Sequence, residues 1–245
     1  MRRRRPRDPI VPAPEVAAFR AARARVLDRI AEACARVGRD PSEVALVAVS
    51  KTVPAERLVD AIAAGLTTLG ENRVQEAEAK VRAVAGAQWH LIGPLQSNKA
   101  RRALETFDVI ESVDSVDLAV RLDRLVGELA RPAPLPILLQ VNVDADPAKA
   151  GFAARDLERA MAVLDGLRRL EIRGLMTVGR LVERAEDARP TFAALRTLAT
   201  EVRRAWPGLG PELSMGMSDD YGVAIEEGAT IVRVGRAIFG ERPNA

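Results

Sequence analysis

The sequence predicts an α/β protein, a single (β/α)8 barrel of the TIM type with an extra N-terminal helix. Three observations support this fold class. Between residues 44 and 240, eight short apolar segments alternate with amphipathic segments of helical period. The apolar segments carry few charges, as expected for parallel strands buried on both faces. The chain has 245 residues, 48% of them hydrophobic, and barrels of this length commonly form one domain.

The elements follow one another in a regular order. The additional helix is expected at residues 14–37, where apolar residues recur at helical spacing and Gly38 provides the stop. The apolar segments predict strands at residues 44–50, 67–70, 88–92, 108–113, 135–143, 170–176, 212–215 and 230–234. Helices are expected after the first seven, at residues 54–64, 74–84, 98–106, 115–130, 154–167, 183–205 and 219–227. A doubly wound sheet is the alternative, but its first turn is usually Gly-rich, and residues 50–53 contain no glycine.

The basic balance of the chain comes from its first residues. The net charge is +3, and residues 1–7 alone hold five arginines and no acid, so the remainder carries a slight excess of acidic residues. We therefore expect residues 1–13 to be a disordered Arg/Pro-rich tail and residues 14–245 to form the single barrel domain. DNA binding through the tail is an alternative, although no basic stripe on the folded body is expected.

Composition also excludes several classes of protein. The one cysteine, Cys34, cannot form an internal disulfide, and its isolation excludes cysteine-rich zinc modules, so no metal site is expected. No apolar run follows the N-terminal arginines as in a signal peptide, and no segment approaches the roughly 18 apolar residues of a transmembrane helix. We expect a cytoplasmic protein that binds neither membrane nor nucleic acid.

Lys51 directly follows the first predicted strand, and chemistry in such barrels lies at the C-terminal ends of the strands. The chain strongly prefers arginine, because of its 37 basic residues only four are lysines: Lys51, Lys80, Lys99 and Lys149. A lysine at this place is therefore a candidate for chemistry, since a neutral lysine amine attacks aldehydes and forms an imine. The alternative is a structural ion pair with a loop carboxylate such as Glu71.

The last two predicted strands are followed by turns that suit a phosphate group. Gly216 and Gly235 each open a turn with backbone N–H groups at the start of a helical segment. Ser218 adds a hydroxyl and is the expected N-cap of the next helix. A lysine beside a phosphate site indicates either a phosphosugar, as in a Schiff-base aldolase, or pyridoxal 5′-phosphate (PLP). Arg233 favours PLP, because arginine is a known partner of its ring nitrogen, although a structural ion pair is the alternative.

Seven stretches carry a resemblance to a known family. They are VAVSKTVP (47–54), LGENRVQEAEAK (69–80), WHLIGPLQSNKAR (89–101), QVNV with Lys149 and Gly151, GLMTV (174–178), LSMGMSDDY (213–221) and VRVGRAIFG (232–240). In these stretches the chain resembles the YggS/PROSC family of PLP-binding proteins, also called PLP homeostasis proteins. The resemblance implies a barrel like the N-terminal domain of alanine racemase.

The resemblance also implies roles for particular residues. Lys51 would carry PLP as a Schiff base, and Arg233 would face the pyridine nitrogen. The other implied cofactor contacts are the phosphate ligands and one residue beside the ring: Ser218, Gly235, Arg236 and Asn72. His90, Asn98 and Lys99 fall in family motifs without a role that can be assigned.

Two positions depart from the family pattern. Arg73 stands where the family commonly has tyrosine, and Arg236 stands where it commonly has threonine. A hydroxyl contact to the phosphate would be lost at Arg236. The guanidinium either replaces that contact by its charge or points away, and the sequence leaves both open.

Because the family has no established turnover, the resemblance implies a protein that binds, buffers and delivers PLP to PLP-dependent apo-enzymes. Separately, we expect a monomer. The alternative is a slow PLP-dependent amino-acid racemase of fold type III. Racemisation by two bases needs an acid/base group on each face of the substrate carbon. Tyr221 is the only tyrosine, and we expect it to pack in the core or lie on the surface rather than serve as that base.

Overall fold

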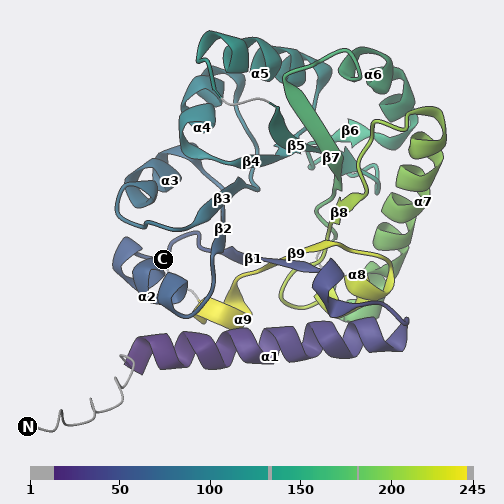
Figure 1. Cartoon of the computed structure of the whole chain (residues 1–245). Helices are drawn as coiled ribbons and strands as arrows, with labels where there is room; N and C mark the ends of the chain where they lie inside the picture. Colours follow the sequence, from purple (N-terminus) through teal and green to yellow (C-terminus); the bar gives the residue numbers. More distant parts are fainter. Residues whose placement is uncertain (1–13, 132–133, 181, 242–245) are drawn as a thin grey trace, which may run out of the picture.

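The computed structural model describes residues 14–131, 134–180 and 182–241, so the expected tail of residues 1–13 lies outside the described residues. The described chain forms a closed barrel of eight parallel strands surrounded by helices, which confirms the predicted fold class (Figure 1). The barrel strands are β1 (Ala45–Val49), β2 (Thr68–Glu71), β3 (Gln88–Leu91), β4 (Val109–Val113), β5 (Leu135–Asn142), β7 (Leu170–Met176), β8 (Glu212–Ser214) and β9 (Ile231–Val234). A two-residue strand, β6 (Phe152–Ala153), pairs with the end of β5.

Helices cover the outside of the barrel. They are α1 (Pro14–Arg36), α2 (Ala55–Ala63), α3 (Val74–Val81), α4 (Ala100–Thr106), α5 (Val116–Glu128), α6 (Leu157–Leu164), α7 (Arg189–Ala205), α8 (Tyr221–Glu226) and α9 (Arg236–Phe239). Short 3-10 turns are η1 (Pro41–Glu43), η2 (Ser97–Lys99), η3 (Ala154–Asp156) and η4 (Ala185–Ala188). The additional helix α1 packs across α2, α8 and α9 (Figure 1). No helix of the described ranges has the length and apolar composition needed to cross a membrane.

Two strand pairings complete the ring of the barrel. One joins the first and last strands, and the other, between β4 and β5, has an irregular register. β9 pairs in parallel with β1, with Val47 opposite Arg233 and Ala48 opposite Val234. β4 pairs with β5 through a register shift and completes the ring. Because all strands run in parallel, the turns that follow them meet at one rim of the barrel.

Apolar packing occurs in two separate layers. The larger cluster lies between the strands and the helices, and includes the fully buried Leu122 of α5 and Phe192 of α7. A smaller cluster fills the inside of the barrel: Val47, Val109, Leu138, Met176 and Ile231. Side chains two positions apart on a strand share a face, so the residues that follow this layer toward the rim also point inward.

The element boundaries show where local sequence rules hold. α1 ends at Arg36, and Gly38 adopts the left-handed conformation with φ of 67°. Ser115 caps α5, since its hydroxyl accepts a hydrogen bond from the Leu118 N–H at 3.3 Å. The expected N-cap at Ser218 is wrong. α8 begins later, at Tyr221.

The N–H groups that an N-cap at Ser218 would accept go to a backbone carbonyl instead, since Asp220 and Tyr221 donate to the Met217 carbonyl at 3.1 and 2.9 Å. Asp220 Oδ1 accepts the N–H of Met217 at 2.6 Å, before α8 starts. The expected helix of residues 183–205 likewise starts late, because residues 185–188 form η4 and α7 begins at Arg189. Both differences are shifts of a helix start by a few residues and leave the order of elements unchanged.

Gly174 of β7 lets two strands approach more closely than any other residue would. A Cβ at this position would lie 1.9 Å from the carbonyl oxygen of Glu212 on β8. We expect Gly174→Ala to lower the free energy of unfolding by about 3 kcal/mol, because β7 and β8 must separate. Urea unfolding measures the change. Gly222→Ala is the control, since the nearest atom there is the Arg36 Nη2 at 3.8 Å and the residue lies in a helix. Equal stability of the two variants would contradict the steric argument.

Candidate functional site

The pairing of β1 with β9 brings three of the expected site residues to one cavity. The cavity has a volume of about 260 Å³ and lies between the turns that follow these two strands. Lys51, Gly235 and Arg236 line it, together with Arg57 of α2. The described lining does not include Asn72, Ser218 or Arg233, which reach the rim from their own strands or turns.

Ser218 and Gly235 are in direct contact. The backbone N–H of Gly235 donates to the Ser218 hydroxyl at 3.2 Å, so the turns after β8 and β9 are joined at the place expected for a phosphate. Arg236 is exposed at the start of α9. Its exposed guanidinium forms an ion pair with Asp219, the neighbour of Ser218, and therefore remains over these two turns.

Asn72 lies at the same rim, directly after β2, and is half-buried. The turn after β3 touches it, because a Cβ at Gly93 would lie 2.3 Å from the Asn72 carbonyl oxygen. Arg73, the other departure from the family pattern, is exposed at the start of α3. The structure therefore places Asn72 in the tightly packed part of the rim and Arg73 on the surface.

Arg233 points into the barrel, where a chain of polar side chains fixes it. It is two residues beyond the apolar Ile231 and only 4% exposed. Its Nη2 donates to the Thr177 carbonyl at 2.7 Å, and its Nη1 donates to the Ser214 hydroxyl at 2.6 Å. Ser214 in turn donates to Glu111 Oε2 at 2.5 Å. These contacts hold the Arg233 guanidinium in one orientation inside the barrel, at the end near the rim.

The row of hydrogen-bonded side chains that begins at Arg233 ends at a carboxylate, Glu111, and an imidazole, His90. Glu111 of β4 is fully buried, and its Oε1 lies 2.6 Å from Nδ1 of His90 on β3. Burial opposes the ionised form of Glu111, but the contacts with His90 and the charge of Arg233 outweigh burial and hold the pKa of Glu111 below its ordinary range. Nε2 of His90 is buried and has no hydrogen-bond partner among the described residues.

Sequence reasoning missed Glu111, although a signal was present. It is the single acidic residue in a strand whose five residues are all buried, and a buried carboxylate requires partners. His90 was noted without a role, and the structure pairs it with Glu111. A search for lone charges in apolar strands would have connected these residues to Arg233.

Glu71, the alternative ion-pair partner for Lys51, contacts Ser50 and Lys80. Glu71 Oε1 accepts hydrogen bonds from the Ser50 hydroxyl at 2.6 Å and from Lys80 Nζ at 2.7 Å. Burial raises the pKa of Glu71, against the effect of these two donors. Lys80 was also missed as a site residue, although it occupies a position on the buried face of α3.

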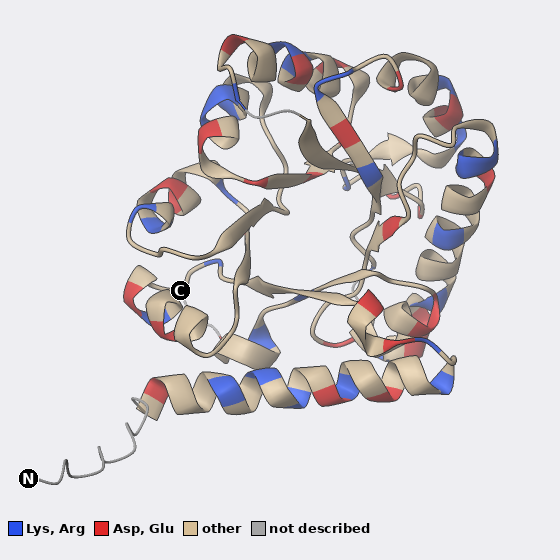
Figure 2. Cartoon of the chain, viewed as in Figure 1, with Lys and Arg blue, Asp and Glu red and all other residues tan. Residues whose placement is uncertain are grey.

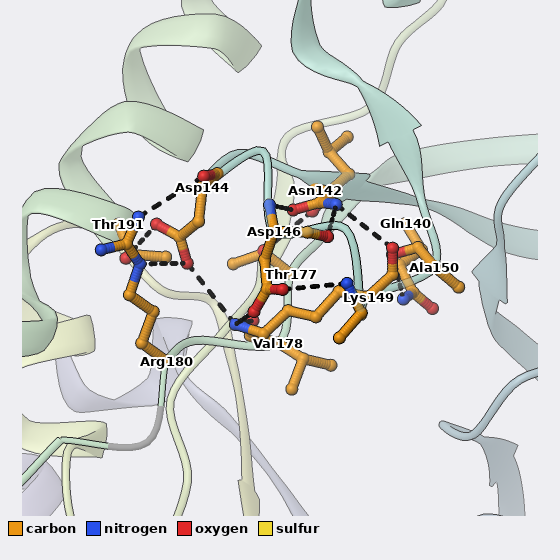
Figure 3. A network of polar contacts seen from close by, with 12 residues as sticks. Gln140, Asn142, Asp144, Asp146, Lys149, Ala150, Thr177, Val178, Arg180 and Thr191 are labelled. Atoms are coloured by element: carbon orange, nitrogen blue, oxygen red, sulfur yellow. Dashed lines mark hydrogen bonds and ion pairs between the residues drawn. The ribbon is translucent and has the colours of Figure 1, made fainter.

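Lys149 belongs to the loop after β5, which a separate polar network organises (Figure 3). Asn142 holds the loop in shape, since its side chain donates to the Asp146 carbonyl at 2.7 Å and accepts from the Asp146 N–H at 3.1 Å. Lys149 Nζ donates to the Val178 carbonyl at 3.1 Å and lies 3.5 Å from Asp144 Oδ2 (Figure 3). Its amine is therefore engaged in bridging the loops after β5 and β7.

Comparison with known proteins identifies the family. The model of the alanine racemase N-terminal domain matches residues 24–243, and the chain belongs to this family. Within it, the chain is similar to proteins named pyridoxal phosphate homeostasis protein. The one from Escherichia coli K12 is 42% identical over 229 residues, and the one from Pseudomonas aeruginosa is 44% identical over 225 residues. Each alignment covers 89% of this chain and 94% of the relative.

Solved structures agree with the sequence relatives. PipY of Synechococcus elongatus PCC7942, solved without PLP, superposes on this chain with a TM-score of 0.78 at 46% sequence identity. The superposition covers 87% of this chain and 99% of the PipY chain. PipY with PLP bound gives a TM-score of 0.76 at 46% identity, over 86% of this chain and 100% of PipY. Alanine racemase of Clostridium difficile 630 shares the fold, with a TM-score of 0.70 at 11% identity over 93% of this chain and 57% of the racemase.

The low pKa of Glu111 leads to a prediction for acid stability. Glu111 stays ionised in the folded protein at pH values where the unfolded chain binds a proton, so folding stability falls as the pH drops below about 4.3 and through the folded pKa. We expect Glu111→Gln to remove this part of the acid dependence. Urea unfolding between about pH 6 and pH 3 measures it. The exposed Glu158→Gln is the control for removing one charge, and an acid slope in Glu111→Gln equal to that of the wild type would refute the assignment.

Proposed function

We propose that the protein binds PLP covalently through Lys51, retains it, and passes it to apo-enzymes that depend on it. One observation carries the proposal. Lys51, Gly235 and Arg236 line a single cavity at the joined ends of β1 and β9. The similarity to PipY, which was solved with PLP bound, and to proteins named for pyridoxal phosphate homeostasis supports it.

The donors at the rim fit the chemical groups of PLP. When bound, PLP supplies an aldehyde carbon that condenses reversibly with a lysine amine with loss of one water, besides a phosphate and a pyridine nitrogen to be recognised. Ser218 and the N–H of Gly235 suit the phosphate, and the Arg236 guanidinium, which is paired with Asp219, lies beside these two donors. Asn72 lies at the same rim, beside the ring in this proposal.

Arg233 suits the ring nitrogen for a reason that bears on turnover. A guanidinium keeps its proton in proteins, so Arg233 can only donate a hydrogen bond and leaves the ring unprotonated. An unprotonated ring withdraws electrons less strongly, which favours retention over amino-acid chemistry. The Arg233 orientation is fixed on two sides, by the Thr177 carbonyl and the Ser214 hydroxyl.

Tyr221 does not suit the role of a second base, which racemisation would require. Its side chain is fully buried at the start of α8, and the Arg29 guanidinium lies over its ring at 4.7 Å from the centroid. Burial raises the pKa of Tyr221. The distant likeness to alanine racemase is a likeness of fold alone.

The anchor is tested by reduction and mapping. Wild-type protein loaded with one equivalent of PLP and treated with borohydride should carry the label on the peptide that contains Lys51. Lys51→Ala should lose the label, because the condensing amine is gone. Lys149→Ala is the matched control and should keep it, since Lys149 bridges the loops after β5 and β7. A wild-type label on Lys80, Lys99 or Lys149 would overturn the anchor.

Delivery is tested separately with an apo-aminotransferase. We expect the loaded protein to restore transaminase activity faster than it releases PLP to a small-molecule scavenger, because the bond to a lysine amine is reversible. Chiral analysis of L-alanine kept with the loaded protein is the parallel measurement. Lysine-dependent formation of D-alanine would replace the carrier proposal by the racemase alternative.

A further inference from the structure

Lys80 of α3 is a buried ammonium whose three protons all have acceptors. Its side chain is 8% exposed, and Nζ lies 2.7 Å from Glu71 Oε1, 2.7 Å from Glu76 Oε1 and 2.8 Å from the Ser50 carbonyl oxygen. An ammonium group has three donors and no acceptor, so this set saturates it. The third bond is the informative one, because Ser50 is the residue directly before Lys51.

A second hydrogen bond holds the residue on the other side of Lys51. Glu76 Oε1, which accepts from Lys80, also accepts the backbone N–H of Thr52 at 2.5 Å. The Ser50 hydroxyl donates to Glu71, the remaining carboxylate of the cluster. The peptide groups on both sides of Lys51 are thus tied to one charged cluster on the outer face of the barrel.

The backbone at this turn is strained. Thr52 has φ of 66°, in the left-handed region that a β-branched residue rarely adopts. Such a conformation persists only where surrounding contacts over-determine it, and strained positions of this kind cluster at functional sites. The N–H of Thr52 is the group that Glu76 holds, so the cluster bears directly on the strained residue.

Stability alone gives a weak reason for this cluster. Burying an ammonium with two carboxylates carries a desolvation penalty that often equals or exceeds the attraction between them, and well-packed apolar residues would serve the fold as well. The neighbouring buried positions on this face of α3 are in fact apolar, at Val74 and Ala77. Apolar residues could not donate to the Ser50 carbonyl, which also accepts the Val53 N–H at 3.0 Å, and could not hold the Glu76 carboxylate that accepts the Thr52 N–H.

We propose that Lys80, acting through Glu76, is a positioning residue that holds the turn of residues 50–52 so that the amine of Lys51 meets the aldehyde of PLP. The inference rests on the proposed function and deepens it. Lys80 itself does not touch the cofactor. Its three hydrogen bonds all go to acceptors on the outer face of the barrel, so it acts by shaping the backbone from which Lys51 extends.

The test compares variants by their affinity for PLP and by the rate of covalent capture. Lys80→Met keeps the shape of the side chain and removes its three hydrogen bonds. We expect both quantities to fall about tenfold, which corresponds to about 1.4 kcal/mol. Glu76→Ala should show a similar loss, whereas Glu76→Gln keeps an acceptor for the Thr52 N–H and should bind nearly as well as the wild type.

A glycine at the strained residue separates positioning from a structural role. Glycine adopts positive φ freely, so Thr52→Gly needs no clamp to hold the turn. We expect Lys80→Met to have a much smaller effect in the Thr52→Gly background than in the wild type. Equal effects in the two backgrounds would show that Lys80 acts through general stability, and would overturn the proposal.

A control separates loss of stability from loss of positioning. Asp123→Asn weakens the pair between Asp123 Oδ2 and Arg169 Nη1 at 3.0 Å, a partly buried ion pair on α5, and should lower stability while leaving PLP capture unchanged. If Lys80→Met fails to fold, the comparison of Glu76→Ala with Glu76→Gln takes its place.

Mapping of the reduced label distinguishes failure of the proposed function from failure of this inference alone. A wild-type label away from Lys51 defeats the proposed function, while a label on Lys51 with unchanged capture in the Lys80 and Glu76 variants defeats only this inference.

Discussion

The parallel pairing of β1 with β9 joins segments that are more than 180 residues apart in the sequence and makes them neighbours. Without this pairing, Lys51 would have neither Gly235 nor Arg236 beside it, and the cavity between their turns would not exist. The register also places Arg233 next to β1 on the inside of the barrel, with Val47 as its partner in the ladder. One set of backbone hydrogen bonds therefore determines both the place of Lys51 and its surroundings.

The barrel interior changes character along its axis. An apolar layer is followed toward the rim by charged and polar side chains, since Glu111 and Arg233 lie two residues beyond Val109 and Ile231 on their strands. These buried charges compensate one another through Ser214 and His90. Figure 2 shows many of the other charges on the surrounding helices and some on the strands, and most of them are exposed, as expected of an ordinary solvated surface. The polar end of the interior is thus one of the few places where charged side chains are buried, as they also are at Glu71 and Lys80.

The order of elements could be predicted because strands buried on both faces read as continuous apolar runs, and all eight were located. Helix starts were less certain. Ser218 looked like a cap, but its hydroxyl instead meets Gly235, a partner 17 residues away that no local pattern reveals. The same limit applies to Glu111 and to the contacts of Lys80 with Glu71 and Ser50, because these partners come from other strands and turns. Lys51 and Gly235 could be named because each directly follows a predicted strand, whereas the contacts of Glu111 with His90 and Ser214 form across the fold.

The dependence of the rim on its last strand has a consequence during synthesis. A chain emerging from the ribosome presents Lys51 long before residues 231–241 exist, and domains generally fold as units once their sequence is available. Until β9 docks, Lys51 is an ordinary solvated amine beside an unfinished sheet. The cavity that Lys51 shares with Gly235 and Arg236 arises only when the ring closes, so it forms in one step with the rest of the barrel and not gradually during synthesis.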